Sequence, residues 1–127
     1  MDKMIYSSLK LEKLVFDKIL FDRVGFKNDS ELELEMEIKI GEDHETYRVS
    51  LILRGTKEKE YHLEVGISGF FTLENLDSFI NKEELLEKNA VAILMPYLRS
   101  QVSLITTQPD TEPVVLPILN INNLMKK

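Results

Sequence analysis

Apolar and charged side chains alternate strictly from Glu31 to Ile40, in the order ELELEMEIKI. A strand places every second residue on the same face, whereas a helix would scatter these apolar residues around its circumference. The alternation therefore predicts a half-buried strand. Its apolar face carries five side chains: Leu32, Leu34, Met36, Ile38 and Ile40.

The same period returns in two further segments. A turn beginning at Gly41 leads into a strand that carries Tyr47, Val49, Leu51 and Leu53, and a turn beginning at Gly55 leads into one that carries Tyr61, Leu63, Val65 and Ile67. Both turns are short and polar, so they permit antiparallel hairpins and leave no room for a crossover helix.

An earlier strand shows a change of phase. Leu9 and Leu11 follow one alternation, while Leu14, Phe16 and Leu20 follow another. An extra residue near Glu12-Lys13 would reset the face that points inward, so we expect a β-bulge there. A four-stranded meander is the simplest arrangement, with a different pairing of the first strand as the alternative.

Helical patterns follow the segment Gly69-Phe70-Phe71. Asn81 followed by Glu84 is typical of a helix start, and Asn89 is expected to cap a second helix that runs to about Thr106. The opening turns, Ala90 to Met95, are apolar in every direction, which predicts burial on all sides and hence self-association. Pro96 should kink this helix. Extended chain is expected from Pro109 to Pro117, and a last turn from Asn120 to Leu124.

Composition narrows the functional classes. The chain has 127 residues, with 16 basic and 22 acidic side chains, a net charge of −6 and no cysteine. This size predicts one domain, residues 1–127. The acidic balance disfavours nucleic acid or an anionic membrane as the main partner. Without cysteine there is no disulfide framework, and no signal-peptide pattern opens the sequence, so we expect a cytoplasmic protein.

Catalytic and metal-binding patterns are weak. His62 and Glu64 alternate onto one face of a strand, and His44 lies among carboxylates in a predicted turn. A zinc site needs at least three convergent protein ligands. No glycine-rich phosphate loop or nucleophile elbow is present. We therefore expect neither an enzyme, nor a metal site, nor a cofactor.

Three motifs resemble the SecB family of bacterial export chaperones. They are Glu64-Val65 followed by Gly69-Phe70-Phe71, then Ala92-Ile93-Leu94-Met95-Pro96-Tyr97-Leu98-Arg99, and then Leu116-Pro117-Ile118-Leu119-Asn120 followed by Leu124. The resemblance implies an α+β fold, in which a four-stranded antiparallel sheet is packed on one side by a long kinked helix plus shorter helices. It also implies a homotetramer, assembled as a dimer of dimers, that holds unfolded precursor polypeptides without ATP and delivers them to the SecA motor.

The resemblance suggests three sets of site residues. A client groove would be lined by Leu9, Leu11, Leu14, Phe16, Leu32, Leu34, Met36, Phe70 and Phe71. A subunit interface would use Ile93, Leu94, Tyr97, Leu98, Gln101 and Ile105. Docking of the motor would use Asp22 and Glu64, although Lys18 stands where the family has an acid. A reversed charge weakens or redirects contact with a basic partner.

Two alternatives remain open at the level of sequence. The chain could keep a SecB-like fold yet serve as an adaptor that binds one specific partner, for example in stress or toxin control. The glutamates at positions 31, 33, 35 and 37 could dock a basic partner, but such a row more often keeps one sheet face solvated.

Overall fold

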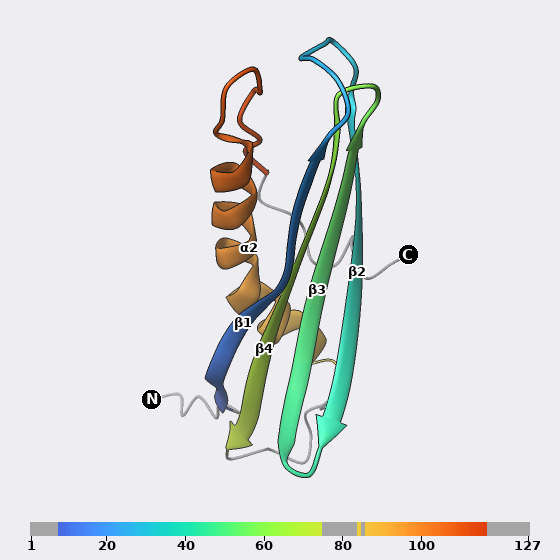
Figure 1. Ribbon diagram of the computed structural model, residues 1–127. Helices are drawn as coiled ribbons and strands as arrows, with labels where there is room; N and C mark the ends of the chain where they lie inside the picture. Colours follow the sequence, from blue (N-terminus) through green and yellow to red (C-terminus); the bar gives the residue numbers. More distant parts are fainter. Residues whose placement is uncertain (1–7, 75–83, 85, 117–127) are drawn as a thin grey trace.

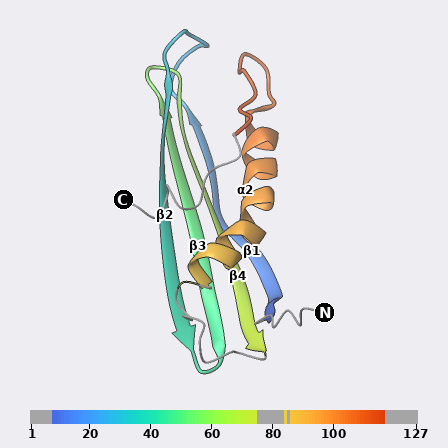
Figure 2. The same cartoon turned by 180° about the vertical axis from the view of Figure 1, so that it is seen from behind.

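The computed structural model describes residues 8–74, 84 and 86–116. Its strands are β1 (Ser8–Arg23), β2 (Leu32–Asp43), β3 (Thr46–Lys57) and β4 (Tyr61–Glu74). A short π-helical segment, Leu86–Ala90, leads into the helix α2 (Val91–Thr106). Long strands form one sheet, and α2 lies against one of its faces (Figure 1, Figure 2). This is the predicted α+β architecture. We call the face under α2 the inner face and the opposite one the open face.

All strand pairs are antiparallel, and the order across the sheet is β1-β4-β3-β2. The meander holds for β2, β3 and β4, while the alternative, a different pairing of the first strand, holds for β1, which pairs with β4 rather than with β2. This pairing sets Leu11 opposite Phe71 and Phe16 opposite Ile67, so that the apolar side chains of β1 meet those of β4. Consequently β1 and β2 are the two edges of the sheet.

Two irregularities interrupt β1. The register passes from Leu11 opposite Phe71 to Lys13 opposite Phe70, which leaves Glu12 as an extra residue and confirms the predicted bulge. A second shift, not predicted, lies between Phe16 and Lys18 at Asp17. The first bulge explains why Leu9 and Leu11 share the inner face with Leu14 and Phe16 despite the change of phase.

The core lies between α2 and the two central strands. Val49, Leu51, Val65 and Ile67 are completely buried, as the alternation predicts. On α2 the buried side chains form one face: Val91, Leu94, Met95, Leu98, Val102 and Thr106. None of the helices in the described ranges is long and apolar enough to cross a lipid bilayer.

The helix differs from expectation at its start and on its outer side. Ala90, not Asn89, occupies the N-cap position and makes no side-chain cap hydrogen bond, because the π-helical turn already leads into α2. The end at Thr106 is as predicted. Burial on all sides is wrong for the single chain, in which Ala92, Pro96, Tyr97, Ser100 and Leu104 are exposed. The predicted start at Asn81 and the last turn from Asn120 to Leu124 lie outside the described residues.

Candidate functional site

An apolar strip on the inner face of β2 is the strongest candidate for a binding surface. Helix α2 packs chiefly on β4 and β3. Leu34 is 40% exposed and Ile40 36% exposed, while Met36 and Ile38 are half-buried. We define the β2 strip as Leu32, Leu34, Met36, Ile38 and Ile40. It is a row of apolar side chains accessible to a partner.

The geometry of β2 keeps this strip regular. All twelve residues of β2 pair with β3 in one unbroken register. Leu34 lies opposite Gly55, where a Cβ atom would be 3.1 Å from Leu34 Cδ2. The absence of a side chain at Gly55 therefore provides the space in which Leu34 rests on the sheet. Alternation continues to Ile40, so Ile38 and Ile40, which are missing from the predicted groove, belong to the same surface.

The structure does not bring the nine predicted client residues into one groove. Four of them, Leu9, Leu11, Leu14 and Phe16, are half-buried on the inner face of β1, at the opposite edge of the sheet from β2. Because β1 pairs with β4, the width of the sheet and the α2 helix separate these residues from the β2 strip.

Phe70 and Phe71, both predicted to line the client groove, point to opposite faces of the sheet. Phe71 is completely buried in the core, where it cannot contact a client. Phe70 points to the open face, between the cationic groups of Lys13 at 5.8 Å and Arg48 at 5.3 Å from its ring centroid. Successive residues of a strand point to opposite faces, so one groove cannot use both.

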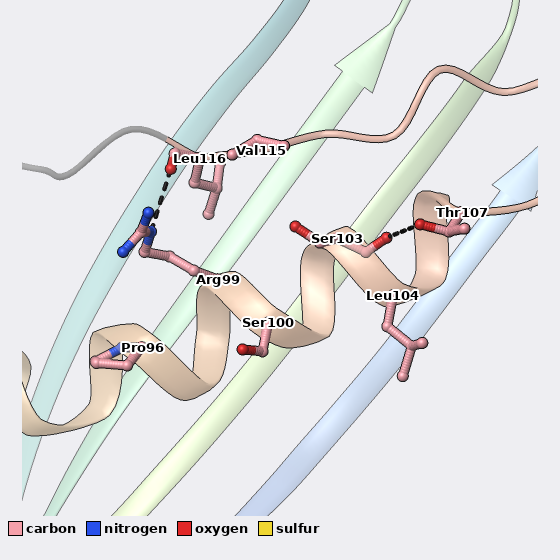
Figure 3. A pocket seen from close by; sticks show the side chains of 8 residues that line it. All are labelled: Pro96, Arg99, Ser100, Ser103, Leu104, Thr107, Val115 and Leu116. Atoms are coloured by element: carbon pink, nitrogen blue, oxygen red, sulfur yellow. Dashed lines mark hydrogen bonds between the residues drawn. The ribbon is translucent and has the colours of Figure 1, made fainter.

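A hollow of about 540 Å³ lies on the outer side of α2. Its lining combines α2 with the chain that follows it, and Figure 3 shows this segment running alongside the helix. Three hydrogen bonds join the segment to α2. Arg99 Nε donates to the Leu116 carbonyl at 3.1 Å, Ser103 Oγ donates to the Val114 carbonyl at 2.8 Å, and the Val114 N–H donates to Thr106 Oγ1 at 2.8 Å. Leu104 and Val115 at its rim are 67% and 75% exposed.

The residues predicted for the subunit interface divide between core and surface. Leu94 and Leu98 are completely buried within the single chain, so they have no surface left for a second copy. Ile93, Gln101 and Ile105 are half-buried, and Tyr97 is 48% exposed. The outer stripe of α2 is instead spaced by four, three and four residues: Ile93, Tyr97, Ser100 and Leu104. This heptad-like spacing was available in the sequence and would have identified Leu104.

The predicted docking carboxylates lie on the open face in different environments. Glu64 is 3.3 Å from Lys18 Nζ and 3.8 Å from Arg54 Nε, and its side chain is only 23% exposed. Lys18, the residue with the unexpected charge, therefore partly neutralises one of the two carboxylates that were expected to meet a basic partner. Asp22, opposite His62, is exposed.

Asp17 forms a second polar cluster on the open face. The bulge at this residue places its carboxylate 2.9 Å from Arg48 Nη2, and Ser68 Oγ donates a hydrogen bond to it. Ser50 Oγ lies 2.7 Å from Ser68 Oγ. These groups satisfy one another across three strands, so the cluster is a structural tie rather than a reactive site.

The weak signal for acid–base or metal chemistry does not develop into a site. His62 Nδ1 lies 3.4 Å from Thr56 Oγ1, while Glu64 pairs with Lys18 and Arg54. The described residues contain no group of three or more histidines or carboxylates positioned to hold a metal ion.

The sequence matches the family described as preprotein translocase subunit SecB over residues 6–127. The chain belongs to the SecB family. It is also 31% identical over 101 residues to the uncharacterized protein MJ0357 of Methanocaldococcus jannaschii. That alignment covers 74% of this chain and 64% of MJ0357, so the chain spans just under two thirds of this relative.

Solved structures share the fold of this SecB-family chain. The SecB-like chaperone Rv1957 of Mycobacterium tuberculosis, in complex with a ChAD peptide from the antitoxin HigA1 (Rv1956), superposes with a TM-score of 0.72 at 16% identity, covering 88% of this chain and 91% of Rv1957. A protein of unknown function from Streptococcus agalactiae gives a TM-score of 0.51 at 14% identity, covering 89% and 99%. At these identities the likeness shows the fold alone.

Proposed function

We propose that this SecB-family protein is an ATP-independent holdase that binds unfolded polypeptide segments on the β2 strip. The observation that carries the proposal is the apolar inner face of an edge strand, with Leu34 and Ile40 exposed beside the helix-covered core. Rv1957, which shares the fold, is a SecB-like chaperone with a peptide from a partner protein. Membership of the SecB family supports the same class of ligand.

The chemistry of the strip suits many different client sequences. Burial of one exposed leucine or isoleucine side chain contributes up to about 2 kcal/mol, so several such contacts give a useful but reversible affinity. Met36 adds a flexible, polarisable side chain that adapts to differently shaped partners. These apolar contacts do not depend on a particular client sequence, so the strip should bind exposed apolar segments in general. A client is released when another protein competes for its apolar segments.

Charge on the other face of β2 keeps this apolar surface in solution. Glu33, Glu35 and Glu37 alternate with the strip and point to the open face. A charged edge strand also resists pairing with the edge strand of another folded protein. The strip is therefore presented on a strand that remains soluble without a client.

The direct test is suppression of aggregation by the purified full chain. A chemically unfolded substrate protein is diluted into buffer with no nucleotide, and its light scattering is followed as the amount of chain increases. We expect scattering to fall to the baseline near a stoichiometric ratio, with no effect of added ATP. Unchanged scattering at a tenfold excess would exclude the holdase function.

A SecB-fold adaptor that serves one partner is the second candidate, and the Lys18–Glu64 ion pair favours it over general export. SecA docking in the family uses acidic positions on the sheet, and here one matching carboxylate is already paired. An antitoxin peptide bound by Rv1957 supports a dedicated partner as a use of this fold. Delivery of clients to SecA is the finer function, and it requires that the open face bind the basic SecA tail.

Reversal of the charge at Lys18 separates these two possibilities. Lys18→Glu removes the ion pair to Glu64 and restores an acidic position, so we expect affinity for the zinc-bearing SecA tail to rise by roughly tenfold, because complementary charge governs such contacts. Titration of the tail by isothermal calorimetry measures this. Lys39→Glu is the matched control near the β2 edge of the same face. Equal, undetectable binding by wild type and both variants would favour the adaptor.

The remaining features of the proposal follow from the family. We propose a cytoplasmic protein that works without a cofactor and assembles as a homodimer or a dimer of dimers. The outer stripe of α2, with Tyr97 and Leu104 exposed in the single chain, supports helix-to-helix association.

A further inference from the structure

An exposed phenylalanine stands at one end of the sheet. The connection between β1 and β2, residues 24–31, projects beyond the β3–β4 turn (Figure 1). Phe26 in this connection is 84% exposed, more than any other large apolar side chain of the described residues. Single exposed aliphatic side chains are common on protein surfaces. Phe26 differs because most of the apolar surface of its aromatic ring makes no contact within the fold.

Hydrogen bonds on both sides of Phe26 hold its loop in place. The N–H groups of Val24 and Gly25 donate to the Glu60 carbonyl at 2.8 and 3.1 Å. The Lys27 N–H donates to Asp110 Oδ2 at 3.1 Å, and the Asn28 N–H donates to Glu60 Oε1 at 2.9 Å. The exposure of Phe26 is therefore a property of an ordered loop.

Close packing fixes the same loop against the β3–β4 turn. A Cβ atom at Gly25 would be only 2.1 Å from the carbonyl oxygen of Lys59, so the two chain segments touch at a position that only glycine fits. An aromatic side chain presented on such a scaffold loses little conformational entropy when it binds. Rigid aromatic anchors of this kind dominate the binding energy of many protein interfaces.

The surface around Phe26 is acidic. Asp29, Glu31, Glu33 and Glu58 are exposed, and none of these four side chains forms an ion pair or a hydrogen bond with another described residue. The chain segments that carry them are neighbours, because Asn28 Nδ2 donates to the Glu58 backbone carbonyl and Leu32 pairs with Lys57. Only two exposed ammonium groups, those of Lys27 and Lys59, lie on the same turns.

We propose that this end of the sheet docks a folded protein partner through Phe26, and that the partner presents a basic surface around an apolar pocket. The four carboxylates specify the charge of the partner, and the ring specifies the pocket. Two copies of this chain do not fit together through this end, because the four carboxylates of one copy would face those of the other. Phe26 lies on the loop that precedes β2, and the docking surface meets the β2 strip only at its first residues. The partner can therefore dock while a client is held on the part of the strip that ends at Ile40.

A photo-crosslinker at the anchor position tests the proposal. The photoreactive p-benzoylphenylalanine is incorporated at position 26 of the full chain in cells that express the protein, with incorporation at position 115 as the control, because Val115 is similarly exposed but lies beside α2. Proteins crosslinked from position 26 and not from position 115 are identified by mass spectrometry. Each is then purified, and its affinity for the uncrosslinked chain is measured.

We expect one folded, basic protein whose affinity falls at least about tenfold with Phe26→Ala and is retained with Phe26→Trp. Glu31→Gln with Glu33→Gln should weaken binding severalfold and reduce its dependence on salt. Suppression of aggregation should be unchanged in Phe26→Ala and in Phe26→Trp. Three results would overturn the proposal: crosslinks only to unfolded clients or to a second copy, a partner indifferent to Phe26→Ala, or no protein specific to position 26.

Discussion

Suppression of aggregation is expected to disappear in the double variant Leu34→Glu with Met36→Glu. Two carboxylates in the middle of the β2 strip would each have to be desolvated by an apolar client, at a cost that exceeds the gain from the remaining contacts. The fold should survive, because Leu34 is 40% exposed and Met36 lies at the edge of the core. Light scattering of an unfolded substrate measures the loss, and circular dichroism checks the fold.

A pair of single substitutions separates this strip from the hollow beside α2. Leu34→Glu places one carboxylate at an exposed position of the strip and should give a partial loss of aggregation suppression. Val115→Glu places one carboxylate at an exposed position of the hollow, outside the outer stripe of α2, and should leave aggregation suppression close to that of wild type. Full activity of the β2 double variant, or loss of activity in Val115→Glu, would place the client elsewhere.

The largest loss of stability is expected from Lys57→Met. Lys57 Nζ donates to Glu60 Oε1 and to the Asn28 carbonyl, each at 2.5 Å, and the Glu60 side chain is only 1% exposed. Among the described residues Glu60 Oε2 has no hydrogen-bond partner, so this carboxylate depends on Lys57. Removal of one partner of a buried pair costs about 3 to 5 kcal/mol. Urea unfolding at fixed chain concentration should show this as a lower midpoint.

At acid pH the difference in the free energy of unfolding between wild type and Lys57→Met should become smaller. Burial alone raises the pKa of Glu60, but the hydrogen bonds from Lys57 and Asn28 and the charges of Lys57 and Arg23 outweigh it and hold the pKa below its ordinary value of 4.5. The resulting stability is present above about pH 4.5 and is lost as pH falls through the folded-state pKa. Without the hydrogen bond and the charge of Lys57, burial should raise the pKa of Glu60, so protonation of Glu60 should offset part of the stability lost in Lys57→Met.

Comparison of unfolding midpoints between pH 7 and pH 3 measures this linkage. We expect the gap between wild type and Lys57→Met to shrink across that range. Lys39→Met is the control, because Lys39 is exposed and its pair with Glu37 is worth less than about 1 kcal/mol at any pH. A gap that stays constant with pH would show that Glu60 does not titrate as a partner of Lys57.

The strands could be predicted well from the sequence, because a half-buried strand alternates apolar and polar side chains with a period of two residues. Val49, Leu51, Val65 and Ile67 alternate in the sequence and are all completely buried. The pairing of β1 with β4 was not predictable, because alternation shows which face a residue occupies and says nothing of its neighbour. Asn89 is not a helix cap, because it lies within the π-helical turn that leads into α2. A local side-chain preference is too weak to end that turn at residue 89.

The candidate site was predicted in part. Leu34 and Met36 lie on the accessible strip, because their alternation and the family resemblance agreed there. Leu9 and Phe16 share the inner face but lie at the other edge, which only the strand order reveals. Phe26 was missed altogether, since one aromatic residue in a connection belongs to no period. Its exposure depends on tertiary contacts with Glu60 and Asp110.

Hydrogen exchange of the full chain with and without an unfolded client most directly tests whether β2 is the client-binding strand. The probe is a reduced, carboxymethylated substrate protein that cannot refold, and exchange is followed by mass spectrometry of peptic peptides. We predict added protection in peptides from Leu32–Asp43, with little change in those covering the helix Val91–Thr106. Protection confined to the helix or to β1, with β2 exchanging as in the free chain, would contradict the account.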